Sequence, residues 1–118
     1  MKNLLLTLVL LLAFSFVNAQ KLTPKFLEGN WETEFHNVEF KIVNKKELKI
    51  TIILKEINEP IDVLSYKIHE GALYMETYYA PNNWAAVGKV VFLNNDTMVE
   101  DVVSKHSGTL IYKRKLNN

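Results

Sequence analysis

Three histidines, and the serines of one short loop, are the side chains in this sequence that could bind a metal ion or act as a nucleophile. His36, His69 and His106 each stand alone, without a His-x-His or His-Glu-x-x-His spacing that would place two imidazoles on one metal ion. Residues 104–108 place two serines beside His106, but chain neighbours seldom face each other and no Gly-x-Ser-x-Gly motif is present. We interpret the histidines as surface loop residues and predict no catalytic site, metal or cofactor.

Glu100 and Asp101 are neighbouring carboxylates in a stretch with strand-like composition. Successive strand residues point to opposite faces, so the two groups cannot act on one substrate atom as a glycosidase pair does. One of them must still face the core if both faces of the strand are covered, and a buried carboxyl group needs a partner or a raised pKa. We expect that acid to pair with an inward tyrosine or a bound ligand. A small hydrolase or isomerase that uses this single acid is a weaker alternative.

The composition argues against a nucleic-acid partner. The 118 residues contain 14 Lys and Arg and 13 Asp and Glu, and residues 1–19 contribute only Lys2 to these charges. The remaining chain therefore has no net positive field to attract phosphates, which also disfavours an open oligonucleotide-binding barrel, the rival fold at this length. The absence of cysteine excludes thiol catalysis, cysteine-bound zinc and disulfides, so stability must come from packing alone.

Residues 1–19 have the features of a secretory signal peptide. Lys2 gives a positive start, residues 4–17 are apolar apart from a threonine and a serine, and Val17 and Ala19 place small residues before a cleavage site. The apolar run is shorter than the roughly 20 residues that a membrane-spanning helix needs. We predict cleavage after Ala19 and a single domain, residues 20–118, that is secreted or periplasmic without a transmembrane anchor. The plain signal and the many lysines suggest a bacterial source.

Alternation of apolar and polar residues recurs along the rest of the chain, which is typical of a β-sandwich or barrel. Turn-forming residues separate the alternating stretches, among them His36-Asn37 and Glu70-Gly71. Pro60 is expected to end a strand, and the longest connection is expected at residues 80–85. The predicted strands are residues 31–35, 38–42, 48–55, 64–68, 73–79, 86–92, 97–103 and 109–114, and in the seventh the inward face is ambiguous.

All links between these strands are short, so strands that are neighbours in sequence should pair antiparallel. Unpaired edges are avoided either by closure or by stacking of two sheets, and the lack of a long crossover favours closure. The sequence therefore predicts an all-β fold, an eight-stranded antiparallel up-and-down barrel, with a helical turn within residues 21–28. Such a barrel is just wide enough to be filled by side chains or to hold one small ligand.

Residues at both ends of the predicted barrel resemble the lipocalin family. Gly29-Asn30-Trp31 is similar to the Gly-x-Trp signature on the first strand of lipocalins and their calycin relatives, and Arg114 is placed like the arginine of their last strand. The resemblance spans residues 28–116, although the lipocalin disulfides, second motif and C-terminal helix are missing. It implies a compact barrel that binds a small apolar molecule, with Gly29, Trp31 and Arg114 at its closed base. A guanidinium stacked on an indole would gain a cation–π contact there.

Inward positions of the predicted strands define a candidate ligand site. Ala86 and Gly88 are small enough to leave space beside large apolar side chains, and tyrosines can supply hydroxyl groups. We predict a non-enzymatic binding protein for a small hydrophobic molecule that enters near residues 80–85, and a fully packed interior is the alternative. Phe35 and Leu64 are also expected to face inward. The candidate ligand-binding residues are Phe40, Ile52, Tyr66, Met75, Tyr79, Trp84, Phe92 and Tyr112.

An aromatic surface near residues 80–85 supports a second function. Tyr74 and Tyr78 fall on the outward face of their predicted strand, and Trp84 follows in the adjoining connection. Aromatic side chains exposed together are typical of surfaces that bind a protein or a glycan. A packed barrel with this surface would be an interaction module. Trp84 is its contact point in that case, and a lid over the barrel mouth in the ligand-binding case.

Overall fold

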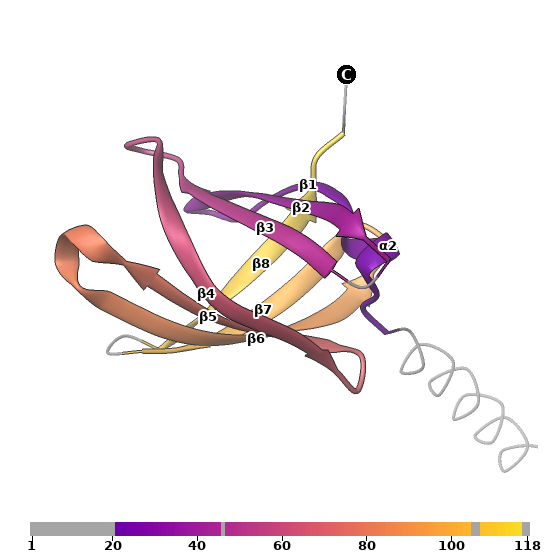
Figure 1. Ribbon diagram of the computed structural model, residues 1–118. Helices are drawn as coiled ribbons and strands as arrows, with labels where there is room; N and C mark the ends of the chain where they lie inside the picture. The colour runs from indigo at the N-terminus through magenta and orange to yellow at the C-terminus, as the bar shows by residue number, and fades with distance from the viewer. Residues whose placement is uncertain (1–20, 46, 105–106, 117–118) are drawn as a thin grey trace, which may run out of the picture.

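The computed structural model describes residues 21–45, 47–104 and 107–116. Within them, eight strands close into an antiparallel up-and-down barrel in the order of the sequence (Figure 1), which confirms the predicted fold class. The signal peptide predicted for residues 1–19 and its cleavage site lie outside the described residues. The elements are α2 (Pro24–Leu27), β1 (Gly29–Glu32), β2 (His36–Asn44), β3 (Glu47–Leu54), β4 (Glu59–His69), β5 (Ala72–Tyr79), the 3₁₀ turn η1 (Ala80–Asn82), β6 (Trp84–Asn94), β7 (Thr97–Val103) and β8 (Gly108–Arg114).

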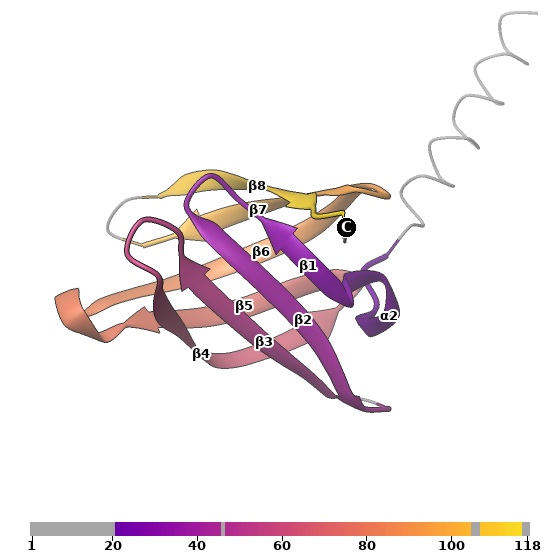
Figure 2. The same ribbon diagram turned by 90° about the horizontal axis from the view of Figure 1, so that it is seen from above.

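The two ends of the barrel differ, and we call them the base and the mouth. The base is the end where α2 lies, beside the start of β1 and the end of β8 (Figure 2). The mouth is the opposite end, where β2, β4, β6 and β8 begin. This distinction matters because the helix covers only the base, so any access to the interior along the barrel axis is through the mouth.

The short helix α2 seals the base. The Thr23 hydroxyl accepts a hydrogen bond from the Phe26 amide (3.1 Å) as an N-cap, and Pro24 occupies the first helical position, where its missing N–H costs nothing. Leu22, which precedes the helix, and Leu27, its last residue, are buried in the core. The predicted helical turn in residues 21–28 is therefore confirmed, and its apolar residues cover the bottom of the barrel.

Trp31 and Arg114 meet at this base as the sequence predicted. They are directly opposite each other in the ladder between β1 and β8, and the guanidinium carbon of Arg114 lies 4.2 Å from the centre of the Trp31 ring. The buried indole nitrogen donates to the Leu27 carbonyl (2.8 Å), while Arg114 Nη2 donates to the Phe26 carbonyl (2.9 Å). Gly29 has a φ of 124°, a conformation that L side chains rarely adopt.

The predicted position of Phe35 is wrong. β1 ends at Glu32, and the Thr33 hydroxyl then accepts hydrogen bonds from the amides of Phe35 (3.2 Å) and His36 (3.0 Å) to form a turn. Phe35 lies in this turn rather than in a strand and is 54% exposed. The dipeptide His36-Asn37 is consequently the start of β2 and not a link between strands.

Leu64 is also predicted wrongly, for a different reason. The register of β4 against β5 shifts between Val63 and Ser65, so the alternation of the sequence is broken at this bulge. Leu64 points out of the barrel and is 59% exposed, whereas the half-buried Ile61 and Val63 pack against the core. Pro60 does not end a strand either, because it is the second residue of β4 and pairs with Ile53.

Strands β3 and β4 diverge below the mouth (Figure 1). They pair only over Ile52–Leu54 and Glu59–Ile61, which is a short ladder for strands of this length. Nearer the base, the Leu48 amide donates a hydrogen bond to the Tyr66 hydroxyl (2.6 Å) across the space between the strands. The phenol therefore satisfies a backbone donor that the missing ladder would otherwise leave without a partner.

Candidate functional site

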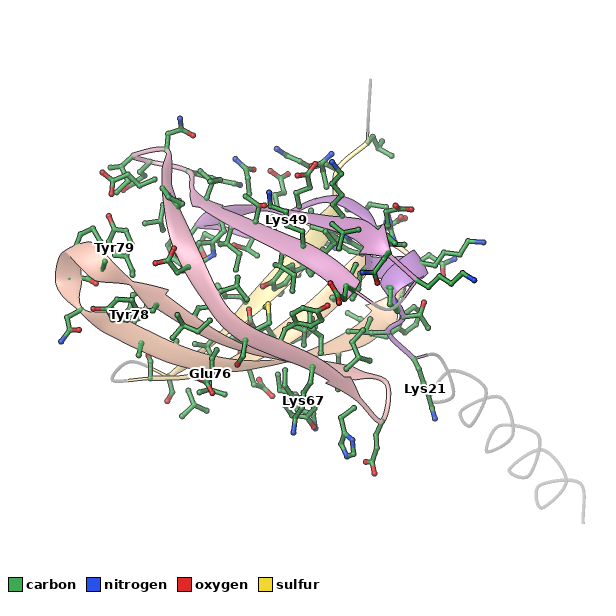
Figure 3. The ribbon with its side chains drawn as sticks, viewed as in Figure 1. Lys21, Lys49, Lys67, Glu76, Tyr78 and Tyr79 are labelled. Atoms are coloured by element: carbon green, nitrogen blue, oxygen red, sulfur yellow. The ribbon has the colours of Figure 1, made fainter. Side chains whose placement is uncertain are left out.

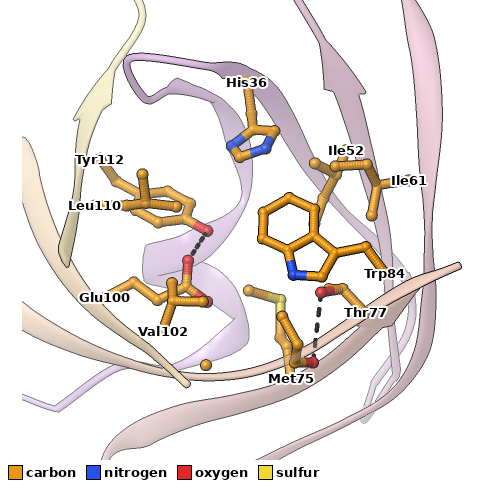
Figure 4. Close-up of a pocket in the computed structure, with 12 residues that line it drawn as sticks. His36, Ile52, Ile61, Met75, Thr77, Trp84, Glu100, Val102, Leu110 and Tyr112 are labelled. Atoms are coloured by element: carbon orange, nitrogen blue, oxygen red, sulfur yellow. Dashed lines mark hydrogen bonds between the residues drawn. The ribbon is translucent and has the colours of Figure 1, made fainter. Parts of the chain in front are cut away.

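A pocket of about 60 Å³ lies inside the mouth half of the barrel (Figure 4). Every strand from β2 to β8 contributes to its wall, which is mostly apolar with a few polar groups. The pocket lies toward the mouth, since α2, Trp31 and Phe26 fill the other end of the barrel. The lining residues are His36, Ile52, Ile61, Met75, Thr77, Trp84, Ala86, Gly88, Glu100, Val102, Leu110 and Tyr112.

Glu100 is the buried acid of this pocket, with 5% of its surface exposed. Its Oε1 atom accepts a hydrogen bond from the Tyr112 hydroxyl at 2.7 Å, which confirms that the inward acid pairs with an inward tyrosine. Burial raises the pKa of Glu100, and the Tyr112 hydrogen bond opposes that shift. Burial, together with the charge of Glu100, also raises the pKa of Tyr112 well above its usual range. The phenol therefore acts as a neutral hydrogen-bond donor.

Gly88 makes room for this carboxyl group. Position 88 of β6 lies against the Glu100 side chain, and a Cβ built there would overlap its Oε2 atom. Among the described residues, no group donates a hydrogen bond to Oε2. Every fully buried side-chain oxygen or nitrogen there has a hydrogen-bond partner, so Oε2, which has none, is not fully buried. The second carboxyl oxygen is therefore the polar atom that a molecule in the pocket can reach.

His36 differs from the predicted surface loop residue, because it is a half-buried residue at the start of β2 that lines the pocket. Its Nδ1 atom is hydrogen-bonded to the Thr33 hydroxyl at 3.0 Å. Burial lowers the pKa of His36, and the charge of Lys55 adds to this effect. The ring therefore stays neutral to a lower pH than an ordinary histidine does. His69 is exposed as predicted, and His106 lies outside the described residues.

Trp84 lies across the pocket from Glu100 and Tyr112, at the mouth (Figure 4). It is the first residue of β6 and follows Asn83, whose left-handed backbone (φ 53°) turns the chain back into the barrel. The Tyr78 hydroxyl donates to the Asn83 side chain (2.7 Å) and holds this turn. The indole is 37% exposed, so it covers part of the mouth while one of its faces lines the pocket.

The structure brings only some of the predicted ligand-binding residues together. Phe40 is buried in the core, Phe92 packs against Phe26 near the base with ring centres 5.2 Å apart, and neither lines the pocket. The Tyr66 hydroxyl is engaged by the Leu48 amide. Tyr79 is the last residue of β5, at the rim of the mouth, where its exposed hydroxyl donates to Glu59 (2.6 Å), and it does not line the pocket. The predicted residues that do line the pocket are Ile52, Met75, Trp84 and Tyr112.

Sequence reasoning missed several of the residues that line the pocket. The sequence pattern predicts a loop at His36, and Ile61 lies outside the predicted fourth strand. Val102 belonged to a strand whose inward face was ambiguous. Their common signal is position, because each of these residues is near the mouth-side end of its strand. That signal becomes readable only when the closed antiparallel order and the sealed base are known.

The aromatic residues of the alternative surface do not form one patch. The Tyr74 ring lies between the ammonium groups of Lys67 and Lys89, at 5.6 and 5.8 Å. Tyr78 is near the mouth, separated from Lys67 along the barrel (Figure 3). The Trp84 indole lines the interior pocket instead of joining either tyrosine. An interaction module that uses these three residues stays a prediction, without a shared surface to support it.

Comparison with known proteins finds no matching family model, no matching curated protein and no matching solved structure. Within residues 21–45, 47–104 and 107–116, no helix is long and apolar enough to cross a membrane. The same residues contain no cluster of three or more metal-ligating side chains. Function is therefore inferred from the shape and chemistry of the pocket.

Proposed function

We propose that this protein is an exported, non-enzymatic, lipocalin-like binding protein that holds a small, largely apolar molecule in the mouth pocket. The observation that carries the proposal is a cavity between Trp84 and the Glu100–Tyr112 pair, inside a barrel whose base is filled. Concave, mostly apolar sites with a few convergent polar groups are typical of small-molecule binding. The contact between Trp31 and Arg114 supports the resemblance to lipocalins.

The size of the cavity limits the ligand. A cavity of about 60 Å³ is less than half of the roughly 150 Å³ that accommodates benzene in an engineered protein core. The ligand is therefore a compact molecule and not a long-chain lipid, as long as Trp84 stays in place. If this half-covered indole rotated out of the mouth, the space that it occupies would be added to the pocket. We therefore propose that Trp84 is a lid over the pocket.

The chemistry of the wall favours binding over catalysis. Glu100 is the one acidic residue of the described lining, and its partner is a phenol instead of a second titrating acid or base. The Thr77 hydroxyl is directed to the Ala86 carbonyl, at 3.5 Å. An activated nucleophile would need a hydrogen bond to a base that a third group orients. The described lining contains a carboxyl group that can recognise a ligand, but no nucleophile that is hydrogen-bonded to an oriented base.

A matched pair of alanines on β6 tests this proposal. Ala86 lines the pocket, whereas its neighbour Ala85 is exposed on the outside of the same strand. Isobutanol is nearly as large as benzene, so its binding requires Trp84 to move outward. When it is titrated into ¹⁵N-labelled protein, it is expected to cause saturable shifts of the Met75, Trp84, Glu100 and Leu110 amides. Ala86→Phe should weaken binding by about tenfold or more, corresponding to about 1.4 kcal/mol. Ala85→Phe should leave binding unchanged.

The controls decide what a negative result means. Circular dichroism establishes that each variant is folded, and Ala86→Leu offers a smaller filling if the phenylalanine is not tolerated. Shifts that do not saturate in the wild type, or equal weakening by the substitutions at positions 85 and 86, would overturn the proposed function. Unchanged affinity in folded Ala86→Phe would place the binding site elsewhere.

A further inference from the structure

We infer that the mouth pocket selects a small molecule that carries a protonated amine, with Glu100 as the counter-ion of that amine. The inference rests on the proposed function, because it names the chemical class of the ligand for the same pocket. Four observations carry it: the missing cation, the free carboxyl oxygen, the neutral neighbours and the aromatic wall.

The first observation is that Glu100 lacks a positive partner. The ion pairs of the described residues join Lys55 to Glu32, His69 to Glu70 and Arg114 to Asp96, and none includes Glu100. The described pocket wall contains no lysine or arginine. An ionised carboxylate that is buried without a cation is strongly unfavourable, and a well-placed positive group relieves much of this cost. A positively charged group bound in the pocket would therefore offset the cost of ionising Glu100.

The second observation is the direction of the carboxyl group. Tyr112 donates to Oε1, and Oε2 lies against Gly88 of β6 without a donor among the described residues. Glu100 lines the pocket and Oε2 is not fully buried, so a ligand can approach this second oxygen. An ammonium group has three donor hydrogens, and one of them can bond to this oxygen. Charge-assisted hydrogen bonds of this kind are about twice as strong as neutral ones.

The other described residues of the pocket wall supply no positive charge and include an aromatic ring. The titratable residues of the described wall are Tyr112 from β8 and His36 from β2, and burial, which lowers the pKa of His36, keeps this ring from supplying the positive charge. The Trp84 indole lines the same pocket, and an aromatic ring attracts a cation placed over its face. A carboxylate ligand would meet the like charge of Glu100. The expected order of affinity is therefore amine, then alcohol, then carboxylate.

Binding of the amine is linked to a proton. When Glu100 is protonated, the ammonium group can pair with it only after the carboxyl proton leaves to solvent, so amine binding releases a proton and alcohol binding does not. The affinity for the amine should rise with pH as Glu100 ionises. It should fall again near pH 10, where an alkylamine loses its own charge, by analogy with a lysine side chain.

Three probes of one shape test the inference: isobutylamine, isobutanol and isobutyrate, titrated into the intact mature chain. Isobutylamine should bind about tenfold more tightly than isobutanol at pH 7.5, and isobutyrate should bind most weakly. Glu100→Gln should remove the preference for the amine and retain isobutanol binding. Glu76→Gln, on the exposed outer face of β5, is the matched control and should change neither affinity. Calorimetry in buffers of different ionisation enthalpy, at a pH low enough for Glu100 to be protonated in the free protein, should detect proton release for the amine only.

The outcomes separate this inference from the proposed function. Saturable isobutanol binding without a preference for isobutylamine, or a preference that survives in Glu100→Gln, would overturn the inference and leave the proposed function standing. Absence of binding by all three probes would overturn both. If Glu100→Gln does not fold, Tyr112→Phe keeps the carboxyl group and removes only its donor. The amine should still be preferred in that variant, and an equal affinity for amine and alcohol would contradict the inference.

Discussion

Glu100 is packed tightly into the barrel wall and is also the residue that we propose binds the ligand. Its carboxyl group is buried against Gly88, is held by the Tyr112 hydroxyl and reaches the pocket through its second oxygen. The sequence predicted an inward acid with a tyrosine partner. It could not tell Glu100 from Asp101, because the strand of residues 97–103 carries apolar side chains on both faces. Glu100 is the inward residue because its carboxyl group fits in the space left by Gly88 on β6. The position of this space next to Glu100 depends on the register of β6 against β7.

The pH dependence of stability tests the environment of Glu100. Because burial raises the pKa of this carboxyl, the folded state holds its proton more tightly than the unfolded chain does. The stability that this difference provides is complete below the unfolded pKa, near 4.5, and is lost as the pH rises through the raised folded value. The free energy of unfolding of the wild type, minus that of Glu100→Gln, should therefore decrease as the pH rises above 4.5.

Urea denaturation at a series of pH values measures this difference directly. His36 has the opposite sign, because its lowered pKa makes stability fall as the pH drops below 6.5, but it is present in both proteins and cancels in the subtraction. A difference that stays constant with pH, or that increases above pH 4.5, would show that Glu100 is not desolvated in the folded state.

At the scale of elements, the alternation of the sequence predicted the strands well but not their irregularities. β7 begins and ends where predicted, whereas the register shift between Val63 and Ser65 turned Leu64 outward. A bulge changes the face of the residues beyond it without any change in composition. Phe35 was misplaced because a threonine-centred turn replaced the end of β1. Alternation alone carries no signal for either event.

The hydroxyl of Tyr66 is the clearest element-level test. It accepts the Leu48 amide hydrogen where β3 and β4 are not paired, so Tyr66→Phe should leave a backbone donor without its partner. We expect this substitution to lower the free energy of unfolding by about 1–3 kcal/mol, the usual cost of an unsatisfied polar group. Urea denaturation measures the loss, and hydrogen exchange of the Leu48 amide should accelerate.

Tyr74→Phe provides the comparison for this experiment. Tyr74 is a half-buried residue on the outer face of β5, and its ring contacts Lys67 and Lys89 without depending on the hydroxyl. Its substitution should change stability by less than about 0.5 kcal/mol, as is usual for surface positions. Equal losses for Tyr66→Phe and Tyr74→Phe would mean that the bond to Leu48 does not hold the two strands together.

For the molecule as a whole, the barrel is asymmetric along its axis. The helix α2, Trp31 and Arg114 fill the base through residues far apart in sequence, which compensates for the absence of disulfides. Among the residues that the structure describes, the mouth contains the pocket instead of such a filling. The sequence predicted the closure and the base because short links and the Gly-x-Trp signature are local features. It could not locate the pocket, because the lining combines residues from seven strands near one end.

The occupancy of that pocket is the central claim, and contacts between ligand and methyl groups measure it most directly. Nuclear Overhauser effects between isobutanol and ¹³C-labelled methyl groups should appear at Met75, Val102 and Leu110, which line the pocket. Val87, Val103 and Ile111 carry exposed methyl groups on the outer face and should give none. Effects confined to the outer methyl groups, or absent from Met75 and Leu110 at saturating isobutanol, would contradict the account.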